Sequence, residues 1–192
     1  MVSTEQTKSR ERGKFPVADL VYMAVGAVLI IVCTWISIPF TVPFTLQTFA
    51  VAFVLIFLGG KRGTVSILVY IILGAVGVPV FSGFMGGIGK LMGMTGGYII
   101  GFIFMGLIYW LGEVLFGKKL VIRIVSLLIG LLILYAFGTG WFMIVYAREN
   151  EAIGLWSALT MCVIPFIIPD LVKLGLAVLV GSKMKKLLHI HW

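Results

Sequence analysis

The segment Gly93–Phe102, GMTGGYIIGF, opens a long apolar run with four glycines and one tyrosine. Gly93, Gly97 and Gly101 recur every fourth residue, which places them on one face of a helix. Small residues on such a face let a second helix approach closely. The preceding segment, GVPVFSGFMGGIGK at 77–90, holds further glycines, whose missing side chains let backbone N–H groups approach a ligand. We therefore expect a close helix pair beside a glycine-rich loop.

The composition around this segment is that of a membrane protein. Of the 192 residues, 61% are hydrophobic and 11% are charged, whereas soluble domains have about 45–50% apolar and about 25% charged residues. The first sixteen residues, MVSTEQTKSRERGKFP, are polar, so the apolar run after them does not have the layout of a cleaved signal peptide. We expect a multi-pass protein of the cell membrane.

The apolar runs predict an all-α membrane protein with six transmembrane helices. A span needs about 20 apolar residues, or fewer where neighbouring helices shield it. The predicted helices lie near 20–38, 46–60, 64–80, 95–112 and 121–146, with the sixth within 152–186. The expected organisation is an N-terminal tail at 1–16, a single six-helix membrane domain at 17–188 and a C-terminal tail at 189–192.

The basic residues orient this bundle, because Lys and Arg concentrate in cytoplasmic segments. Twelve of the fifteen fall on one side: Lys8, Arg10, Arg12, Lys14, Lys61, Arg62, Lys118, Lys119, Arg123, Lys183, Lys185 and Lys186. Lys90 and Arg148 fall on the other side, and Lys173 lies within the last span. Both termini are therefore expected to be cytoplasmic, and the net charge of +8 requires no nucleic-acid partner.

The last apolar segment is too long for one crossing. The 35 residues from Ala152 to Lys186 would form a helix of about 52 Å at about 1.5 Å per residue. The motif PFIIPDLVK at 165–173 contains two prolines, and proline suits the first turn of a helix. We predict that the last helix starts at Pro169 near the outer face, after a separate apolar segment at 153–168 that lies over that face.

Polar residues converge at the predicted outer helix starts. They are Gln47 in the second helix, Tyr98 in the fourth, and Asp170 with Lys173 in the sixth. Asp170 and Lys173 are three residues apart and share one helix face. They either neutralise each other, as buried charges usually do, or bind a ligand that carries both hydrogen-bond donors and a negative charge. An ionisable group inside a span is by default a functional-site hypothesis.

Several other functions do not fit the sequence. Both histidines, His189 and His191, lie in the C-terminal tail, so no histidine base or metal cluster is expected among the spans. FMGGIGKL at 84–91 lacks the first glycine of a phosphate-binding loop and the hydroxyl residue after its lysine. We expect no catalytic residues, no metal and no cofactor.

The glycine-rich stretch 77–102 and the PFIIPDLVK motif together resemble the BioY family, and the likeness extends to PFTVPFTLQT at 39–48. Members of this family are the biotin-binding subunits of energy-coupling-factor transporters. The resemblance implies a six-helix protein that captures biotin from outside and associates with a coupling membrane subunit and two ATPase subunits. Three residues depart from the usual pattern: Met94 and Ile168 where proline is common, and Pro169 where glycine is common.

The resemblance also implies roles for particular residues. The expected biotin-binding residues are Gln47, Phe84, Gly96, Gly97, Tyr98, Asp170 and Lys173. Ala24, Gly26 and Ala27 in the first helix correspond to a small-residue face that docks on the coupling subunit. The alternatives are a self-sufficient small-molecule transporter and a binding subunit for another vitamin. The orientation of biotin, and whether Asp170 and Lys173 contact the ligand or each other, stay open.

Overall fold

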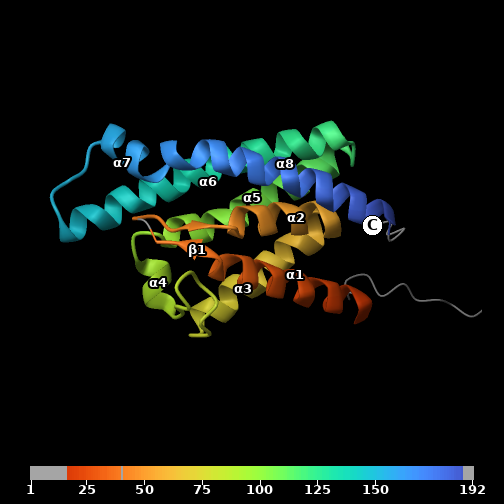
Figure 1. Ribbon diagram of the computed structural model, residues 1–192, viewed down its shortest axis with the longest axis horizontal. Helices are drawn as coiled ribbons and strands as arrows, with labels where there is room; N and C mark the ends of the chain where they lie inside the picture. The colour runs from red at the N-terminus through yellow and green to blue at the C-terminus, as the bar shows by residue number, and fades with distance from the viewer. Residues whose placement is uncertain (1–16, 40, 188–192) are drawn as a thin grey trace, which may run out of the picture.

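The computed structural model describes residues 17–39 and 41–187, and the predicted tails at 1–16 and 189–192 lie outside the described residues. The described residues form eight α-helices and one short antiparallel ribbon (Figure 1). The elements are α1 (Val17–Trp35), β1 (Ser37–Ile38), β2 (Phe44–Thr45), α2 (Gln47–Leu58), α3 (Gly60–Ala75), α4 (Ile88–Met92), α5 (Gly96–Phe116), α6 (Leu120–Glu149), α7 (Leu155–Cys162) and α8 (Ile164–Leu187).

The long helices lie side by side along one axis, and the short elements gather at one end. The most extensive contacts join α5 to α6, α2 to α8 and α3 to α5. Figure 1 shows α4 and α7 at the end opposite the C-terminal end of α8. The short α2 is therefore enclosed by longer helices, and ten of its twelve residues are buried.

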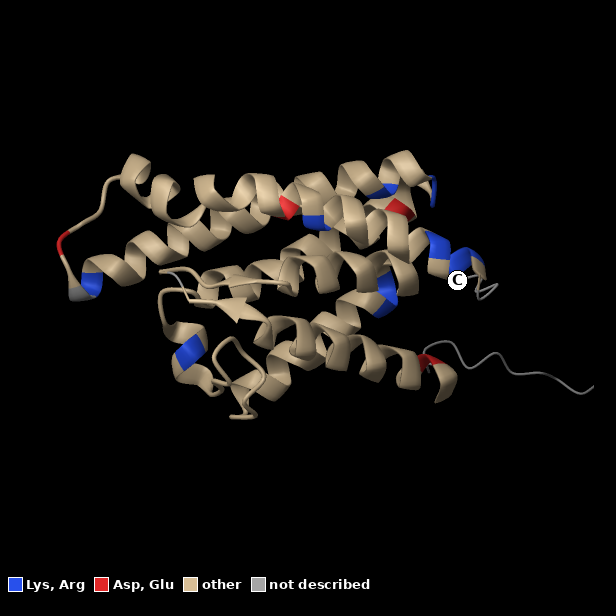
Figure 2. Cartoon of the chain, viewed as in Figure 1, with Lys and Arg blue, Asp and Glu red and all other residues tan. Residues whose placement is uncertain are grey.

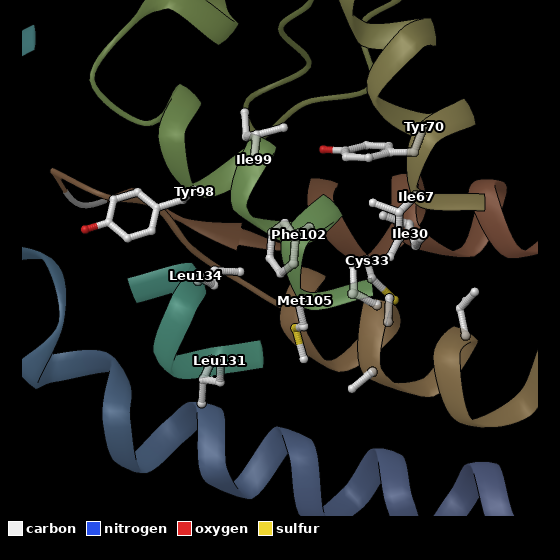
Figure 3. Packing of buried hydrophobic residues seen from close by; sticks show 14 of the residues in the cluster. Ile30, Cys33, Ile67, Tyr70, Tyr98, Ile99, Phe102, Met105, Leu131 and Leu134 are labelled. Atoms are coloured by element: carbon white, nitrogen blue, oxygen red, sulfur yellow. The ribbon is translucent and has the colours of Figure 1, made fainter. Parts of the chain in front are cut away.

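The core lies where α5 passes between its neighbours. Figure 3 shows Phe102 and Met105 of α5 between residues of α6 on one side and residues of α1 and α3 on the other. The flanking side chains belong to one hydrophobic cluster, and those labelled in the figure include Leu131, Leu134, Ile30, Cys33 and Ile67. This packing holds α5 and α6, which carry Tyr98 and Tyr135, in fixed positions relative to each other.

The glycines of segment 93–102 allow the predicted close packing of two helices, α5 and α6. A Cβ atom added at Gly97 would overlap the Trp141 side chain of α6, and one at Gly101 would lie 3.3 Å from Leu134 Cγ. Gly93 precedes α5, and its carbonyl accepts a hydrogen bond from Trp141 Nε1 at 3.1 Å. Gly97 and Gly101 therefore let α5 and α6 pack at short range, as the four-residue spacing predicted.

Four described helices are long and apolar enough to cross a membrane: α1, α5, α6 and α8. The helices α2 and α3, with 12 and 16 residues, are shorter than the predicted spans 46–60 and 64–80. The break between them comes at Gly59, whose φ of 81° is a conformation that glycine readily adopts. Lys61 and Arg62 therefore belong to the first turn of α3 and not to a loop.

The predicted start of the last helix at Pro169 is wrong. The helix α8 begins at Ile164 and contains Pro169, while the preceding apolar segment forms the short helix α7. Pro165 lies in the first turn of α8, where a missing N–H has no helical partner to lose. Pro169 lies in the second turn and forgoes one bond without ending the helix. Pro165 thus has the initiating role that the sequence analysis gave to Pro169.

Charged residues tie helix ends together at one end of the bundle, where Figure 2 shows most of the blue residues. Arg62 of α3 pairs with Asp19 of α1 at 2.8 Å. Glu113 of α5 accepts a hydrogen bond from the Gly60 backbone N–H at 2.6 Å and lies 3.4 Å from Arg123 of α6. These contacts join α3 to α1, and α5 to both α3 and α6, at that end of the bundle.

Candidate functional site

Asp170 and Lys173 form a buried ion pair on α8. Their side chains lie one turn apart on the same face, and Lys173 Nζ donates to Asp170 Oδ1 at 2.9 Å. The two residues are only 4% and 6% exposed. Burying two charges is unfavourable unless they are paired and their remaining hydrogen-bonding capacity is used. The remaining hydrogen-bonding capacity of Asp170 and Lys173 must therefore be used by other groups of the site.

Tyr135 of α6 supplies a second partner for the carboxylate. Its hydroxyl group donates to Asp170 Oδ2 at 2.7 Å, so the two carboxylate oxygens are held by different groups. A hydrogen bond to a charged group is roughly twice as strong as one between neutral groups. The contact therefore fixes the rotation of the carboxylate and links α6 to α8 at this level.

Phe44 covers the other side of the ion pair. It belongs to β2, which pairs with β1 through Ile38 and so turns the chain back over the bundle. Lys173 Nζ lies 3.8 Å from the centre of the Phe44 ring, within the range of a cation–π contact. Phe44 also stacks on Phe166 of α8, with ring centres 6.1 Å apart. The ribbon thus closes the site with an aromatic cover.

Two further tyrosines bring polar groups to the same region. The Tyr98 hydroxyl group is 2.9 Å from Thr139 Oγ1 of α6, and either group can be the donor. The Gln47 amide, at the start of α2, donates to the Tyr70 hydroxyl group at 3.1 Å. Buried Tyr and Gln side chains usually have such partners. Each of these groups is therefore held in a defined position by its neighbour.

These side chains surround a small cavity of about 60 Å³. We call it the polar cavity. Its lining comes from residues 41–45, which we call the ribbon loop and which include β2, and from α2, α5, α6, α7 and α8. The lining residues are Val42, Pro43, Thr45, Gln47, Thr48, Tyr98, Phe102, Leu134, Tyr135, Cys162, Phe166, Asp170 and Lys173. Pockets for small molecules usually measure about 300–1,000 Å³. A ligand of that class can enter only if part of the lining moves.

Two larger apolar cavities adjoin the polar cavity. One, of about 400 Å³, lies beside the ribbon loop and shares Phe166 with the polar cavity. The other, of about 710 Å³, lies among α6, α7 and α8 and shares Tyr135 with it. The Phe166 and Tyr135 side chains therefore separate the polar cavity from these larger cavities. Displacement of either side chain would join two cavities and enlarge the site.

The structure brings together four of the seven residues that were predicted to bind the ligand. Gln47, Tyr98, Asp170 and Lys173 all line the polar cavity, although their helices are far apart in sequence. Their gathering agrees with the expectation that helix starts converge. Their role in binding a ligand stays a prediction.

The other three lie outside this lining. Gly96 is packed so closely that an added Cβ would overlap the Leu91 carbonyl group, and Gly97 faces Trp141. Phe84 is 66% exposed and packs on Trp35, with ring centres 5.0 Å apart. In the described conformation, these residues shape the helix pair and an exposed loop and do not contact the cavity.

The predicted docking face on α1 is only partly exposed. Gly26 is buried against α2 and α3, where an added Cβ would lie 2.8 Å from Ser66 Oγ and 3.1 Å from Leu58 Cδ1. Ala27 is also buried, whereas Ala24 is exposed. Of the three predicted docking residues, only Ala24 is therefore exposed in the structure, and the docking role stays a prediction.

Sequence reasoning missed Tyr135 and the position of Cys162. Tyr135 lies in the uncharged run of α6, where the only signal was a hydroxyl group that needs a partner once it is buried. Cys162 is buried and lines the polar cavity. Neither residue belongs to a motif that sequence spacing alone reveals.

Comparison with known proteins matches most of the chain. A sequence profile described as the BioY family matches residues 5–190. The Probable biotin transporter BioY of Pyrococcus horikoshii is 42% identical over 144 residues, which cover 75% of this chain and 81% of that protein. The Biotin transporter BioY of Thermotoga maritima is 39% identical over 176 residues, which cover 88% of this chain and 96% of that protein.

A solved structure shares the fold. It is the crystal structure at 2.1 Å of the S-component for biotin from an ECF-type ABC transporter, which aligns with a TM-score of 0.76 at 26% identity. The alignment covers 88% of this chain and 92% of that chain. The arrangement of helices around the polar cavity therefore belongs to a fold that is already known.

Proposed function

This chain belongs to the BioY family, and from that premise we propose that it captures biotin as the substrate-binding subunit of an energy-coupling-factor transporter. The proposal makes the chain a transport protein and assigns it no reaction of its own. ATP hydrolysis falls to separate ATPase subunits.

The observation that carries the proposal is the set of polar groups around the polar cavity. Biotin has a ureido ring with two N–H donors and one carbonyl acceptor, and a tail that ends in a carboxylate. Asp170 can accept from the N–H groups, and Lys173 can donate to either the carbonyl or the carboxylate group. Gln47 can donate and accept. The apolar side chains around them, such as Phe102 and Phe166, suit the sulfur-containing ring.

The polar cavity must enlarge to hold biotin, because its volume is about 60 Å³. The ribbon loop is the lining segment with the least helical support, and Val42, Pro43 and Thr45 all belong to it. Loops open more easily than packed helices because fewer buried contacts restrain them. We propose that this loop moves to admit biotin and that Phe44 then closes over it.

The charge distribution gives the proposed orientation in the membrane. The basic residues in the first turns of α3 and α6 and at the end of α8 lie at one end of the bundle (Figure 2). Since Lys and Arg concentrate on the cytoplasmic side, we place that end in the cytoplasm. Asp170 is the seventh residue of α8, about 9 Å from its start at about 1.5 Å per residue, and so lies nearer the outer face.

This placement completes the proposed topology. The helices α1, α5, α6 and α8 cross the bilayer, and α2 and α3 complete a six-helix membrane domain while shielded by their neighbours. Both termini are then cytoplasmic. The outer end carries the ribbon, α4 and α7, through which biotin arrives.

The proposed partners are a coupling membrane subunit and two ATPase subunits. The part of α1 that can meet a partner is its exposed side, which includes Val21, Ala24, Val25 and Val28. Ala24 is the small residue on this side, so a foreign helix can approach most closely there. Gly26 and Ala27 are better suited to hold α1 against α2 and α3.

Cysteine protection tests the proposed binding site. Cys162 lines the polar cavity and Cys33 is buried in the core outside it, and these are the only cysteines of the chain. We expect biotin to slow the reaction of Cys162 with N-ethylmaleimide, because a bound ligand fills the cavity through which the reagent reaches the thiol group. The rate is measured by mass spectrometry on the Cys33→Ala variant with and without biotin.

The matched control is the Cys162→Ala variant, in which only Cys33 can react. Biotin should leave its reaction rate unchanged. Riboflavin at the same concentration should protect neither cysteine. A Cys162 rate that is the same with and without biotin contradicts the proposed site, as does equal protection of the two cysteines.

A further inference from the structure

Tyr135 lies at the boundary between the polar cavity and the 710 Å³ cavity among α6, α7 and α8. It is buried in the middle of α6, and its hydroxyl group points to Asp170 of α8 with an O–O distance of 2.7 Å. The larger cavity lies between α6 and α8, which make few direct contacts with each other. The hydroxyl contact therefore bridges two helices that are not closely packed at this level.

The hydroxyl contact determines which way the carboxylate faces. Lys173 holds Oδ1 and Tyr135 holds Oδ2, from two different helices. An ionised carboxylate can accept about four hydrogen bonds, so each oxygen keeps capacity for one more. Rotation of the carboxylate would break both contacts. Tyr135 thus leaves Asp170 able to accept from a ligand while preventing it from turning away.

We infer that Tyr135 is a positioning residue of the biotin site, which holds the Asp170 carboxylate in the orientation that accepts a hydrogen bond from the ligand. This inference rests on the proposed function and goes one step beyond it. Tyr135 acts through Asp170 and requires no contact of its own with biotin. The inference holds whichever end of biotin contacts Asp170, because Tyr135 determines only the direction in which the Asp170 oxygens can accept a hydrogen bond.

A second reason favours this role over simple packing. When Lys173 turns to a polar group of the ligand, Asp170 loses part of its charge compensation at a site that is only 4% exposed. A buried carboxylate needs another donor at that moment. Tyr135 provides one that stays in place. The ion pair can therefore be shared with biotin without leaving an isolated buried charge.

The test is a double-mutant cycle on biotin affinity. Tyr135→Phe keeps the ring and its wall between the cavities and removes only the hydroxyl group. We expect it to weaken biotin binding about ten- to hundredfold, the range for losing a hydrogen bond to a charged group. In an Asp170→Ala background the same change should alter the affinity less than about twofold, because no carboxylate remains to be positioned.

Tyr109→Phe is the matched control. Tyr109 of α5 is a buried tyrosine that does not line the polar cavity. Its biotin affinity should equal that of the wild type. All affinities are measured by isothermal titration on purified protein whose thermal unfolding is recorded in parallel, so that a folding defect is separated from a binding defect.

The outcomes separate this inference from the proposed function. If the wild type binds biotin and Tyr135→Phe binds it equally well, the positioning role is wrong. Equal losses from Tyr135→Phe in the wild-type and Asp170→Ala backgrounds also overturn it, since they indicate an effect that does not pass through Asp170. If the wild type itself does not bind biotin, the proposed function fails instead.

Discussion

Replacing Asp170 with alanine should weaken biotin binding by about 3–5 kcal/mol, which is more than a hundredfold. The change removes the acceptor for the ligand and leaves Lys173 without its partner at 2.9 Å. It also leaves the Tyr135 hydroxyl group without an acceptor. An uncompensated buried charge is among the largest single penalties in proteins. The affinity is measured by isothermal titration.

Two controls locate the cause. Glu151→Ala removes the same charge from an exposed position beyond the end of α6 and should leave the affinity unchanged. Asp170→Ala combined with Lys173→Met removes both charges, so it should recover thermal stability without recovering binding. A folded Asp170→Ala protein with wild-type affinity would show that Asp170 only neutralises Lys173, the alternative that the sequence left open.

The second large effect concerns the glycine contact between α5 and α6. Gly138→Ala should lower the free energy of unfolding by about 1–3 kcal/mol, the usual cost of overpacking. A Cβ atom at Gly138 would overlap the Tyr98 ring. A shift of the ring would disturb the contact of its hydroxyl group with Thr139, which is 2.9 Å away. Thermal unfolding and biotin affinity should therefore both change.

Gly140→Ala is the matched substitution on the same helix. No heavy atom outside the local backbone lies within 4 Å of a Cβ atom added at Gly140. Alanine is a better helix former than glycine by about 0.8–1.0 kcal/mol. The variant should be as stable as the wild type or more so, with unchanged biotin affinity. If both variants unfold at the same temperature, the proposed close contact at Gly138 is wrong.

The sequence was informative where charge and glycine patterns are local. The spacing of Gly97 and Gly101 predicted a close helix pair, and the structure places both against α6. Asp170 and Lys173 stood out because charges are rare inside apolar runs. Their separation of three residues then required a shared helix face. These predictions depend on geometry within one helix, which the sequence alone determines.

Other features depend on how helices rotate against each other, and the sequence carries little information about that. In a membrane helix the lipid-facing and buried sides are both apolar, because lipid tails are as apolar as leucine. Nothing in the sequence therefore indicated that Gly26 faces inward while Ala24 faces outward. The same reason hides Tyr135, whose partner Asp170 is 35 residues away and on another helix.

The start of the last helix shows a different limit. Pro165 and Pro169 both fit the first turn of a helix, and the sequence analysis chose the one nearer to Asp170. In the structure the helix begins five residues earlier, at Ile164, and α7 precedes it. This earlier start places Phe166 where it stacks on Phe44. The position of Phe166 in the cavity lining thus depends on where α8 begins, and the two prolines of the sequence left that start ambiguous.

The measurement that tests the central claim most directly is equilibrium binding of biotin to the purified chain in the absence of coupling and ATPase subunits. Isothermal titration with biotin, riboflavin and thiamine, each at micromolar concentration, compares three vitamins in one preparation. We predict saturable binding of one biotin per chain and no binding of the other two. Binding of riboflavin or thiamine by a folded protein that leaves biotin in solution would contradict the account.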